Sequence, residues 1–420
     1  MREIEIARLG SQGDGIATLP EAGAAEGTVY VPFALEGERV RVTIEGASAR
    51  LGEVLVASPD RVSPACIHFM TCGGCTMQHL QFDRYAAWKR QLVVDALAQR
   101  GITTEIGQLV RGALGDRRRA IMSAKRDRRG RGGVRFGFHE AMSHEIVDLA
   151  MCPVLAPPLA ELIEKLRPVL AALPRWEGEA RVTLIAADNG IDASVDPPSP
   201  AVAATADVIE GVVAALDGLS GIVRFSYAGD VIYQRDLPRI AMGRASVVVP
   251  AGVFLQASGL AERTMAALIT GALGKKVRRV ADLFAGVGAF TFPLAERQSV
   301  LAVDSDGDAL AALRLAARGA DGLKPIETKL RDLFREPLSR KELEGFDAVV
   351  FDPPRAGAKA QAEMIAKSKV PLAVAVSCNP ATLARDVRIL MDGGFRLQSL
   401  TPVDQFVYTA HVEAVAVLAR

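Results

Sequence analysis

Cys378 is the side chain in this sequence that is best placed to act as a nucleophile. It follows the apolar run 372–376, which predicts a buried strand, and it precedes residues 379–382, which predict a turn into a helix. A helix N-terminus can lower the pKa of a nearby thiol, and the thiolate is the form that attacks carbon. A buried structural cysteine is the alternative interpretation, and the neighbouring motifs must decide between the two.

Four other cysteines predict a second site. Cys66, Cys72 and Cys75 lie within ten residues, the last two separated by two glycines, and Cys152 lies far downstream. Because glycine adopts left-handed backbone angles, such a loop can wrap tightly around one centre. Four thiolates complete the ligand set of an iron-sulfur cluster or of zinc, and the spacing leaves these two open. The first gap holds five residues where radical-SAM centres have three, so we expect a structural or RNA-positioning centre and not a redox centre.

The last third of the chain has the order of a nucleotide-binding domain. A strand over 280–284 leads into a turn with Gly286 and Gly288, a helix follows, and a second strand ends at Asp304. This order is typical of a doubly wound α/β sheet, with the acid placed to accept hydrogen bonds from a ribose. The third glycine of dinucleotide-binding proteins is absent. Its absence favours S-adenosylmethionine over NAD, because S-adenosylmethionine has no pyrophosphate.

Several chemically active side chains come directly after predicted strands. Asp332, Asp352 and Cys378 each follow such a strand, and a final strand is expected over 411–418. Open α/β sheets bind their ligands at the carboxyl ends of the strands. We therefore expect these side chains to share one site.

The sequence divides into three domains. Residues 1–57 alternate apolar and polar positions between glycines, which predicts a small β-barrel. Residues 58–250 predict a central α+β domain, and residues 251–420 form the doubly wound domain. Between residues 111 and 135 the chain has ten basic residues and two acids, although its net charge is only +1. This block suits a phosphate backbone, and an exposed basic loop without a ligand is the alternative.

The composition indicates a soluble globular chain, because half of the 420 residues are apolar and the net charge is small. No apolar run reaches the length of a membrane span, and the charged, alternating N-terminus does not have the pattern of a signal peptide. We therefore expect a cytoplasmic protein without membrane contact. Nothing in the sequence indicates an obligate protein partner, so a monomer is expected.

The sequence resembles the uridine-C5 RNA methyltransferases nearly from end to end. The motifs occur in the order found in that family and are the cysteine motif at 66–79, Phe254-Leu255-Gln256, DLFAG at 282–286, DPPRAG at 352–357, SCNP at 377–380 and HVE at 411–413. The TRAM domain, an RNA-binding relative of the OB-fold, is also resembled by the run 10–19 followed by Val29-Tyr30-Val31-Pro32 and Leu35-Glu36-Gly37-Glu38. With this barrel and four cysteines, the sequence is most similar to the iron-sulfur branch, which makes 5-methyluridine in 23S ribosomal RNA.

The resemblance implies a role for each matching residue. Cys378 matches the nucleophile, Glu413 matches the general base, and the four clustered cysteines match the ligands of a 4Fe-4S cluster. The positions that match the S-adenosylmethionine pocket are Gln256, Phe284, Gly286, Asp304, Asp332 and Asp352. Such an enzyme adds the thiolate to uracil C6, transfers a methyl group to C5 and removes the C5 hydrogen before the thiolate leaves. The target base must leave its stack, and we expect the barrel and the basic block to hold flanking nucleotides.

Arg355 and three departures from the family pattern stand out. Arg355 can stabilise an enolate oxygen, hold a phosphate or pair with a carboxylate. Ser258 stands where the family usually has Asn, and Ala289 stands where an Asn often follows the glycines. Val407-Tyr408 replaces the Phe-Pro-like residues that often precede the following threonine.

Other functions compete with this interpretation. A cytosine-C5 methyltransferase would usually have a cysteine just after its DPP motif, where this sequence has Arg355. An amino-methylating enzyme would have an Asn- or Asp-Pro-Pro-Tyr-like motif and no catalytic thiol. The alternatives that stay open are a transfer RNA uridine-C5 methyltransferase and a noncatalytic RNA-binding or folding factor.

Overall fold

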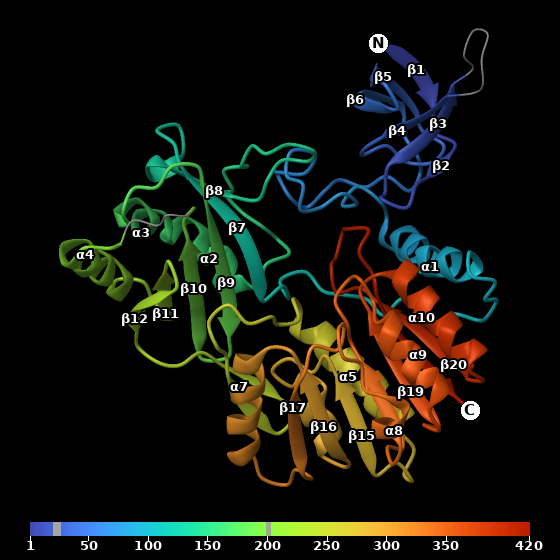
Figure 1. Cartoon of the computed structure of the whole chain (residues 1–420). Helices are drawn as coiled ribbons and strands as arrows, with labels where there is room; N and C mark the ends of the chain where they lie inside the picture. Colours follow the sequence, from blue (N-terminus) through green and yellow to red (C-terminus); the bar gives the residue numbers. More distant parts are fainter. Residues whose placement is uncertain (20–26, 199–202) are drawn as a thin grey trace.

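The computed structural model describes residues 1–19, 27–198 and 203–420, and Figure 1 shows three regions that are each built around a sheet. The N-terminal sheet, in blue, stands apart from the green central sheet and from the yellow to red C-terminal sheet. The regions follow one another along the chain in the predicted order. Within the described residues, no helix is both long and apolar enough to cross a membrane.

Alternating apolar residues build the N-terminal sheet. Its strands are β1 (Arg2–Glu5), β2 (Arg8–Leu9), β3 (Gly15–Leu19), β4 (Gly27–Val31), β5 (Arg39–Glu45) and β6 (Ser48–Val56). They lie in the order β1-β5-β6-β4-β3-β2, and side chains such as Ile6, Val31 and Val40 form the core. Because successive side chains of a strand point to opposite faces, alternation places these residues on one inner face. The result is a barrel-like sheet.

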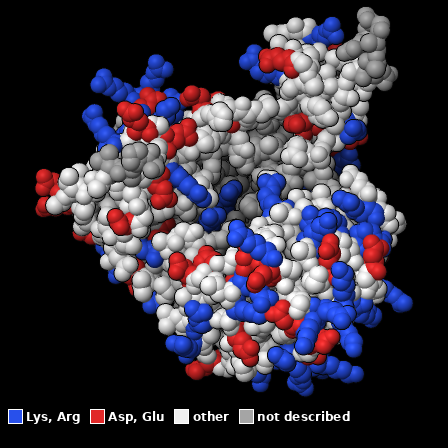
Figure 2. Space-filling model, in the orientation of Figure 1, with Lys and Arg blue, Asp and Glu red and all other residues white. Residues whose placement is uncertain are grey.

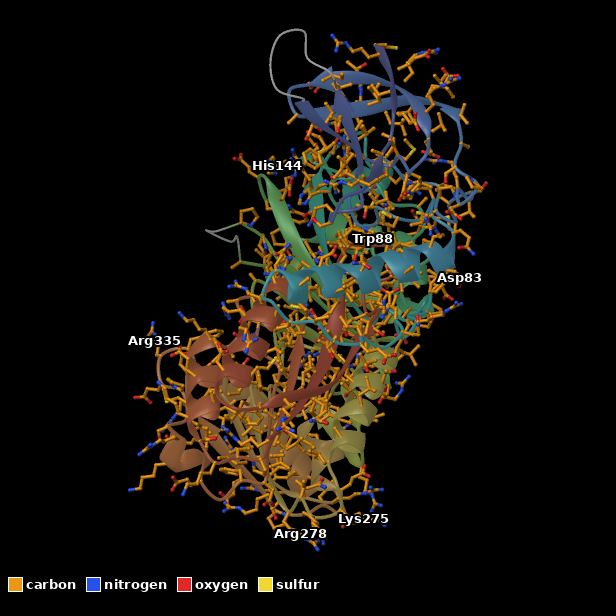
Figure 3. All side chains as sticks on the ribbon, turned by 90° about the vertical axis from the view of Figure 1, so that its right-hand side faces the viewer. Asp83, Trp88, His144, Lys275, Arg278 and Arg335 are labelled. Carbon is orange, nitrogen blue, oxygen red and sulfur yellow. The ribbon has the colours of Figure 1, made fainter. Side chains whose placement is uncertain are left out.

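Helix α1 (Phe82–Ala98) connects the N-terminal sheet with the C-terminal region. The side chain of Gln81 caps the first turn of the helix by accepting two backbone hydrogen bonds. Figure 3 shows the helix, with Trp88 labelled, crossing between the two regions. Trp88 Nε1 donates to the carbonyl of Gly10 at 3.1 Å, and Val93 packs into the core of the C-terminal region.

A second sheet forms the central region. Its elements are β7 (Arg119–Arg126), η1 (Arg131–Gly133), β8 (Val134–Gly137), α2 (Pro157–Lys165), α3 (Arg167–Ala172), β9 (Glu179–Ala187), β10 (Gly190–Asp196), α4 (Ala206–Asp217), β11 (Ile222–Tyr227) and β12 (Asp230–Gln234). The strand order is β12-β11-β10-β9-β7-β8, and Phe136, Leu184 and Phe225 lie in its core. A hairpin of β13 (Arg239–Met242) and β14 (Ala245–Val248) leads into the C-terminal region.

The C-terminal region alternates strands and helices. Its elements are α5 (Gly259–Ala272), β15 (Arg279–Leu283), α6 (Thr291–Ala295), β16 (Ser299–Asp304), α7 (Gly307–Arg318), β17 (Ile326–Leu330), α8 (Arg340–Leu343), β18 (Ala348–Phe351), α9 (Lys359–Lys367), β19 (Leu372–Ser377), α10 (Pro380–Asp392), β20 (Arg396–Val403) and β21 (Glu413–Ala419).

This alternation produces the predicted doubly wound sheet. The strand order is β17-β16-β15-β18-β19-β21-β20, and the first five strands are parallel. The order reverses between β15 and β18, which opens a crevice at the carboxyl ends of these strands. Strand β21 is antiparallel to both β19 and β20. The predicted last strand is therefore present, but it enters the sheet in the opposite direction.

Candidate active site

A cavity of about 430 Å³ opens at the carboxyl edge of the C-terminal sheet. It is formed by the turns that follow β15, β16, β18 and β19 and by the first residue of β21. The predicted site residues that line it are Gln256, Phe284, Gly286, Asp304, Asp352, Arg355, Cys378 and Glu413. These residues therefore share one site at this edge, as expected, but Asp332 does not line it.

The strand register brings the proposed nucleophile and base together. Strands β19 and β21 are antiparallel, and Ser377 pairs with Ala414. Cys378 directly follows Ser377 and Glu413 directly precedes Ala414, so both residues lie at the same end of this strand pair. Glu413 is only 4% exposed, whereas Cys378 is partly buried. The thiol is thus the more accessible group, and the carboxyl group lies deeper in the site.

The thiol of Cys378 is protonated at neutral pH in this structure. Its pKa is raised to about 11, mainly by burial and also by the carboxylates of Glu413 and Asp352, while Arg355 acts in the opposite direction. The expectation that the helix N-terminus lowers this pKa is wrong, because burial and two nearby acids outweigh the helix. Asn379 caps helix α10 with its own side chain. Thiolate formation therefore requires a change in this environment.

Two carboxyl groups with raised pKa values share the site. The pKa of Glu413 is raised to about 8, mainly by burial and also by the charge of Asp352. Burial also raises the pKa of Asp352 to about 7. Because two buried carboxylates repel each other, the pair holds a proton near neutral pH. A carboxyl group with such a pKa is suited to accept a proton during a reaction.

The turn after β15 shapes the other half of the cavity. The backbone N–H of Gly286 donates to Asp304 Oδ2 at 2.8 Å, and the φ angles of Gly286 and Gly288 are 54° and 105°. Only glycine adopts such angles readily. Phe284 also has a positive φ, 62°, and its ring centroid lies 5.4 Å from that of Phe334. Two aromatic rings therefore line the same part of the cavity.

Asp332 does not reach this cavity with the other predicted residues. Its Oδ1 atom accepts a hydrogen bond from the backbone N–H of Phe334 at 2.9 Å, so it holds the turn after β17. The side chain that lines the cavity is Phe334, half-exposed and two residues further on. The sequence prediction selected the acid because it follows a strand, and no motif indicated the aromatic residue.

Gln256 and Arg355 link the motifs around the cavity. Gln256 Nε2 donates to Asp352 Oδ2 at 2.8 Å, which joins the Phe-Leu-Gln and DPP motifs. The carbonyl of Arg355 accepts a hydrogen bond from Asn379 Nδ2 at 3.2 Å. The exposed guanidinium of Arg355 lines the cavity and lowers the pKa of Cys378. A cation therefore lies beside the thiol.

Comparisons with known proteins agree with this site. The model of the tRNA (Uracil-5-)-methyltransferase family matches residues 239–420. An uncharacterized RNA methyltransferase of Brucella suis is 46% identical over 100% of this chain and 98% of its own length. The 23S rRNA (uracil(1939)-C(5))-methyltransferase RlmD of Chromohalobacter salexigens is 33% identical over 99% of this chain and 89% of its own length. The chain belongs to the uracil-C5 RNA methyltransferase family.

A solved structure shares the fold of this methyltransferase. It is the crystal structure of Pyrococcus abyssi tRNA (uracil-54, C5)-methyltransferase in complex with S-adenosyl-L-homocysteine. The two chains have a TM-score of 0.75 and 22% sequence identity, and the match covers 99% of each. This likeness shows a common fold, and the predicted enzyme class is confirmed by family membership. It does not favour the alternative of a noncatalytic RNA-binding factor.

The methyltransferase departs from the family pattern at Ser258, and the structure gives this residue a local role. Ser258 Oγ accepts a hydrogen bond from the backbone N–H of Ala261 at 2.9 Å and thereby caps helix α5. The same hydroxyl donates to the carboxylate of Asp116. Asp116 also accepts from the backbone N–H of Leu260 at 3.2 Å. The serine thus joins the start of α5 to the segment before β7.

The four clustered cysteines of the methyltransferase line a second, smaller cavity. Burial is the main cause that raises the pKa of the Cys75 thiol to about 12 and that of Cys152 to about 11. Soft thiolate donors suit iron-sulfur clusters and zinc. Within the described parts of the chain, however, no group of three or more His, Cys, Asp or Glu side chains is arranged to hold a metal ion. The four thiols therefore line one cavity, as predicted. The described residues do not by themselves establish an iron-sulfur domain.

Part of the basic block between residues 111 and 135 forms ion pairs within the protein. Arg118 pairs with Glu262 at 2.5 Å. Arg131 pairs with Asp148 and Glu164. Arg135 pairs with Asp127 and Glu145. These three side chains are therefore already paired with carboxylates and are not free charges for a phosphate backbone. Figure 2 nevertheless shows Lys and Arg side chains around the hollow between the three regions.

Proposed function

We propose that this enzyme makes 5-methyluridine in 23S ribosomal RNA through a covalent bond between Cys378 and C6 of the target uracil. The observation that carries the proposal is that Cys378 and Glu413, at the same end of the paired strands β19 and β21, line one cavity. The similarity to RlmD of Chromohalobacter salexigens, over nearly the whole of both chains, supports ribosomal RNA as the substrate.

Residues of this chain can perform each step of the reaction. The thiol proton of Cys378 passes to solvent, and the thiolate adds to C6, so that the electrons of the C5–C6 double bond move into the ring and C5 becomes nucleophilic. Arg355 is placed to stabilise the negative charge that develops on the ring oxygen. S-adenosylmethionine, when bound, supplies the methyl group that C5 takes. Glu413 then removes the C5 proton, the electron pair of that bond restores the C5–C6 double bond, and the bond from C6 to sulfur breaks.

The glycine turn and the two aromatic rings support an assignment of the S-adenosylmethionine site. We assign the contact with the ribose to Asp304, because it lies at the end of β16 and lines the cavity. The rings of Phe284 and Phe334 suit contact with the adenine. In this assignment Asp332 does not contact the cofactor and instead holds the turn that carries Phe334. Gln256 and Asp352 line the same cavity as Cys378.

RNA that carries 5-fluorouridine tests the covalent step. Fluorine at C5 cannot leave as a proton, so the methylated adduct of wild-type enzyme should persist and shift the protein on a denaturing gel. Cys378→Ala should form no adduct while still binding S-adenosylmethionine, which shows that the variant is folded. An adduct of normal yield in Cys378→Ala would contradict the proposal.

Transfer RNA is the second candidate substrate, because the family model that matches residues 239–420 has transfer RNA in its description. Mapping of 5-methyluridine in ribosomal and transfer RNA, from cells with and without the protein, separates the two. We expect loss of the modification in 23S ribosomal RNA. A loss confined to transfer RNA would overturn the substrate assignment and leave the chemistry intact.

We also propose that Cys66, Cys72, Cys75 and Cys152 hold a 4Fe-4S cluster. The support is their convergence on one cavity and the preference of such clusters for four thiolates. Iron and acid-labile sulfide in protein purified without oxygen would distinguish a cluster from zinc. All five cysteines are free, which suits the reducing cytoplasm that we propose as the compartment of a monomeric enzyme.

A further inference from the structure

Two glutamines join Asp352 to the buried carboxyl group of Glu413. Gln256 Nε2 donates to Asp352 Oδ2 at 2.8 Å. Gln405 Nε2 donates to Gln256 Oε1 at 2.9 Å and to Glu413 Oε1 at 3.0 Å. Asp352 and Glu413 are therefore the ends of one hydrogen-bonded chain, and Gln405 is the link that contacts the base.

Gln405 lies behind the catalytic cavity and not in it. It belongs to the loop 404–412, which connects β20 to Glu413, the first residue of β21. The side chain is 5% exposed, and the described residues that line the catalytic cavity do not include it. A substrate in that cavity is therefore contacted by Glu413 and not by Gln405.

Helix α1 fixes the loop that carries Gln405. Lys89 Nζ forms an ion pair with the carboxylate of Asp404, and both side chains are fully buried. Lys89 Nζ also donates to the carbonyl of Phe406 at 2.9 Å, and Tyr85 Oη donates to Asp404 Oδ1 at 3.1 Å. The residues before and after Gln405 are thus both held from the same helix. Because its two neighbours are held in place, the side-chain amide of Gln405 points toward Glu413.

We propose that Gln405 is a positioning residue for the step in which Glu413 removes the C5 proton. By donating to Glu413 Oε1, the amide fixes the plane of the carboxyl group and leaves Oε2 to receive the proton. In this step the C5–H bond breaks and the proton passes to Oε2. The electron pair forms the C5–C6 double bond, and the electrons of the C6–S bond return to Cys378. The inference rests on the proposed function, because that function gives Glu413 its role.

The charges around Glu413 determine the expected pH effect. Burial is the largest cause that raises the pKa of Glu413, and the charge of Asp352 also raises it. The hydrogen bond from Gln405 and the charge of Lys89 lower it. Cys378 also faces this carboxyl group. Without the amide donor the carboxylate form is less stable, so the pKa of Glu413 rises further above about 8. Because only the carboxylate accepts a proton, the step then needs a higher pH.

The variant Gln405→Met tests this role, because methionine has a similar length and no amide. Gln398→Met, at an exposed position of β20, is the matched control. The full-length proteins are mixed with uridine RNA and S-adenosylmethionine, and the covalent complex and the released 5-methyluridine RNA are measured over a range of pH.

Gln405→Met should bind S-adenosylmethionine and form the covalent complex as the wild type does. Release of product should be slower by roughly tenfold or more, as expected for loss of one hydrogen bond to a charged group. The midpoint of the pH profile of release should move upward by about one unit. Gln398→Met should match the wild type.

Two results would overturn the inference while leaving the proposed function intact. One is normal release by Gln405→Met, and the other is slow release with an unchanged pH profile, which indicates a purely structural role. A different result would overturn the function itself, namely failure of the wild-type enzyme to form an adduct with 5-fluorouridine RNA.

Discussion

Glu413 and Cys378 show how burial gives ordinary side chains their chemical properties. Glu413 begins β21 and is almost fully buried, so its pKa is raised to about 8, and the neighbouring Asp352 adds to the shift. The same burial raises the pKa of Cys378 to about 11. The free enzyme therefore has an unreactive thiol, and its base titrates slightly above neutral pH. We infer that reactivity develops only when the substrate enters the site.

The variant Glu413→Gln should stall after methyl transfer. Because glutamine cannot accept the C5 proton, the covalent complex with ordinary uridine RNA should accumulate and turnover should fall by about 10²–10⁴-fold. In the wild type, release should increase as the pH rises through about 8, where Glu413 becomes deprotonated. Gel shift and product release measure both effects. The matched control is Glu344→Gln, at an exposed position, which should keep full turnover. Full turnover by Glu413→Gln would exclude Glu413 as the base.

At the scale of elements, a single turn connects β15 to α6 and shapes the cofactor half of the cavity. Gly288 has a φ of 105°, and a Cβ atom at this position would lie 2.6 Å from Phe292 Cε2. Phe292 is itself fully buried in α6. Glycine is therefore required both by the backbone angle and by the close approach of the ring.

Gly288→Ala should lower the stability of the enzyme and its affinity for S-adenosylmethionine. The strained backbone and the contact with Phe292 should cost about 1–3 kcal/mol. Gly271, exposed near the end of α5, has no atom within 4 Å of an added Cβ. Gly271→Ala should therefore be neutral or stabilising by about 0.5–1 kcal/mol. Thermal unfolding and calorimetric titration with the cofactor measure both, and equal stability of the two variants would refute this account.

At the scale of the whole molecule, helix α1 joins parts of the chain that are far apart in sequence. Trp88 contacts the barrel through Gly10, while Lys89 on the same helix pairs with Asp404 beside the active site. The backbone N–H groups of Thr76 and Met77, just after the third cysteine, both donate to the carbonyl of Tyr408. The barrel, the cysteine loop and the active-site loop thus have a common support.

Lys89→Met should destabilise the enzyme by about 3–5 kcal/mol, because it leaves the carboxylate of Asp404 buried without its partner. Adding Asp404→Asn should restore part of the loss by removing that charge. Arg111 pairs with Asp83 at the surface, where the side chains are 64% and 71% exposed, so Arg111→Gln should change stability by less than about 1 kcal/mol. Urea unfolding measures all three. A loss below 1 kcal/mol for Lys89→Met would contradict this view of the support.

Much of the fold and site followed from local patterns. The strand, glycine turn and acid around Gly286 and Asp304 predicted the doubly wound sheet, because apolar periodicity and glycine angles are local properties. Position after a strand also predicted a shared site for Asp352 and Cys378. The same rule misplaced Asp332, since a strand end can hold a turn as well as line a cavity.

The sequence by itself determined the elements, the motifs and the family, because these depend on residue types at short spacing. Only the tertiary structure decided the pairing of β19 with β21, the protonated state of Cys378, the internal pairing of part of the basic block and the link through Gln405. Each of these depends on which distant segments become neighbours and how much water they exclude. Distance and burial set the strength of an electrostatic interaction, and neither is present in a linear chain.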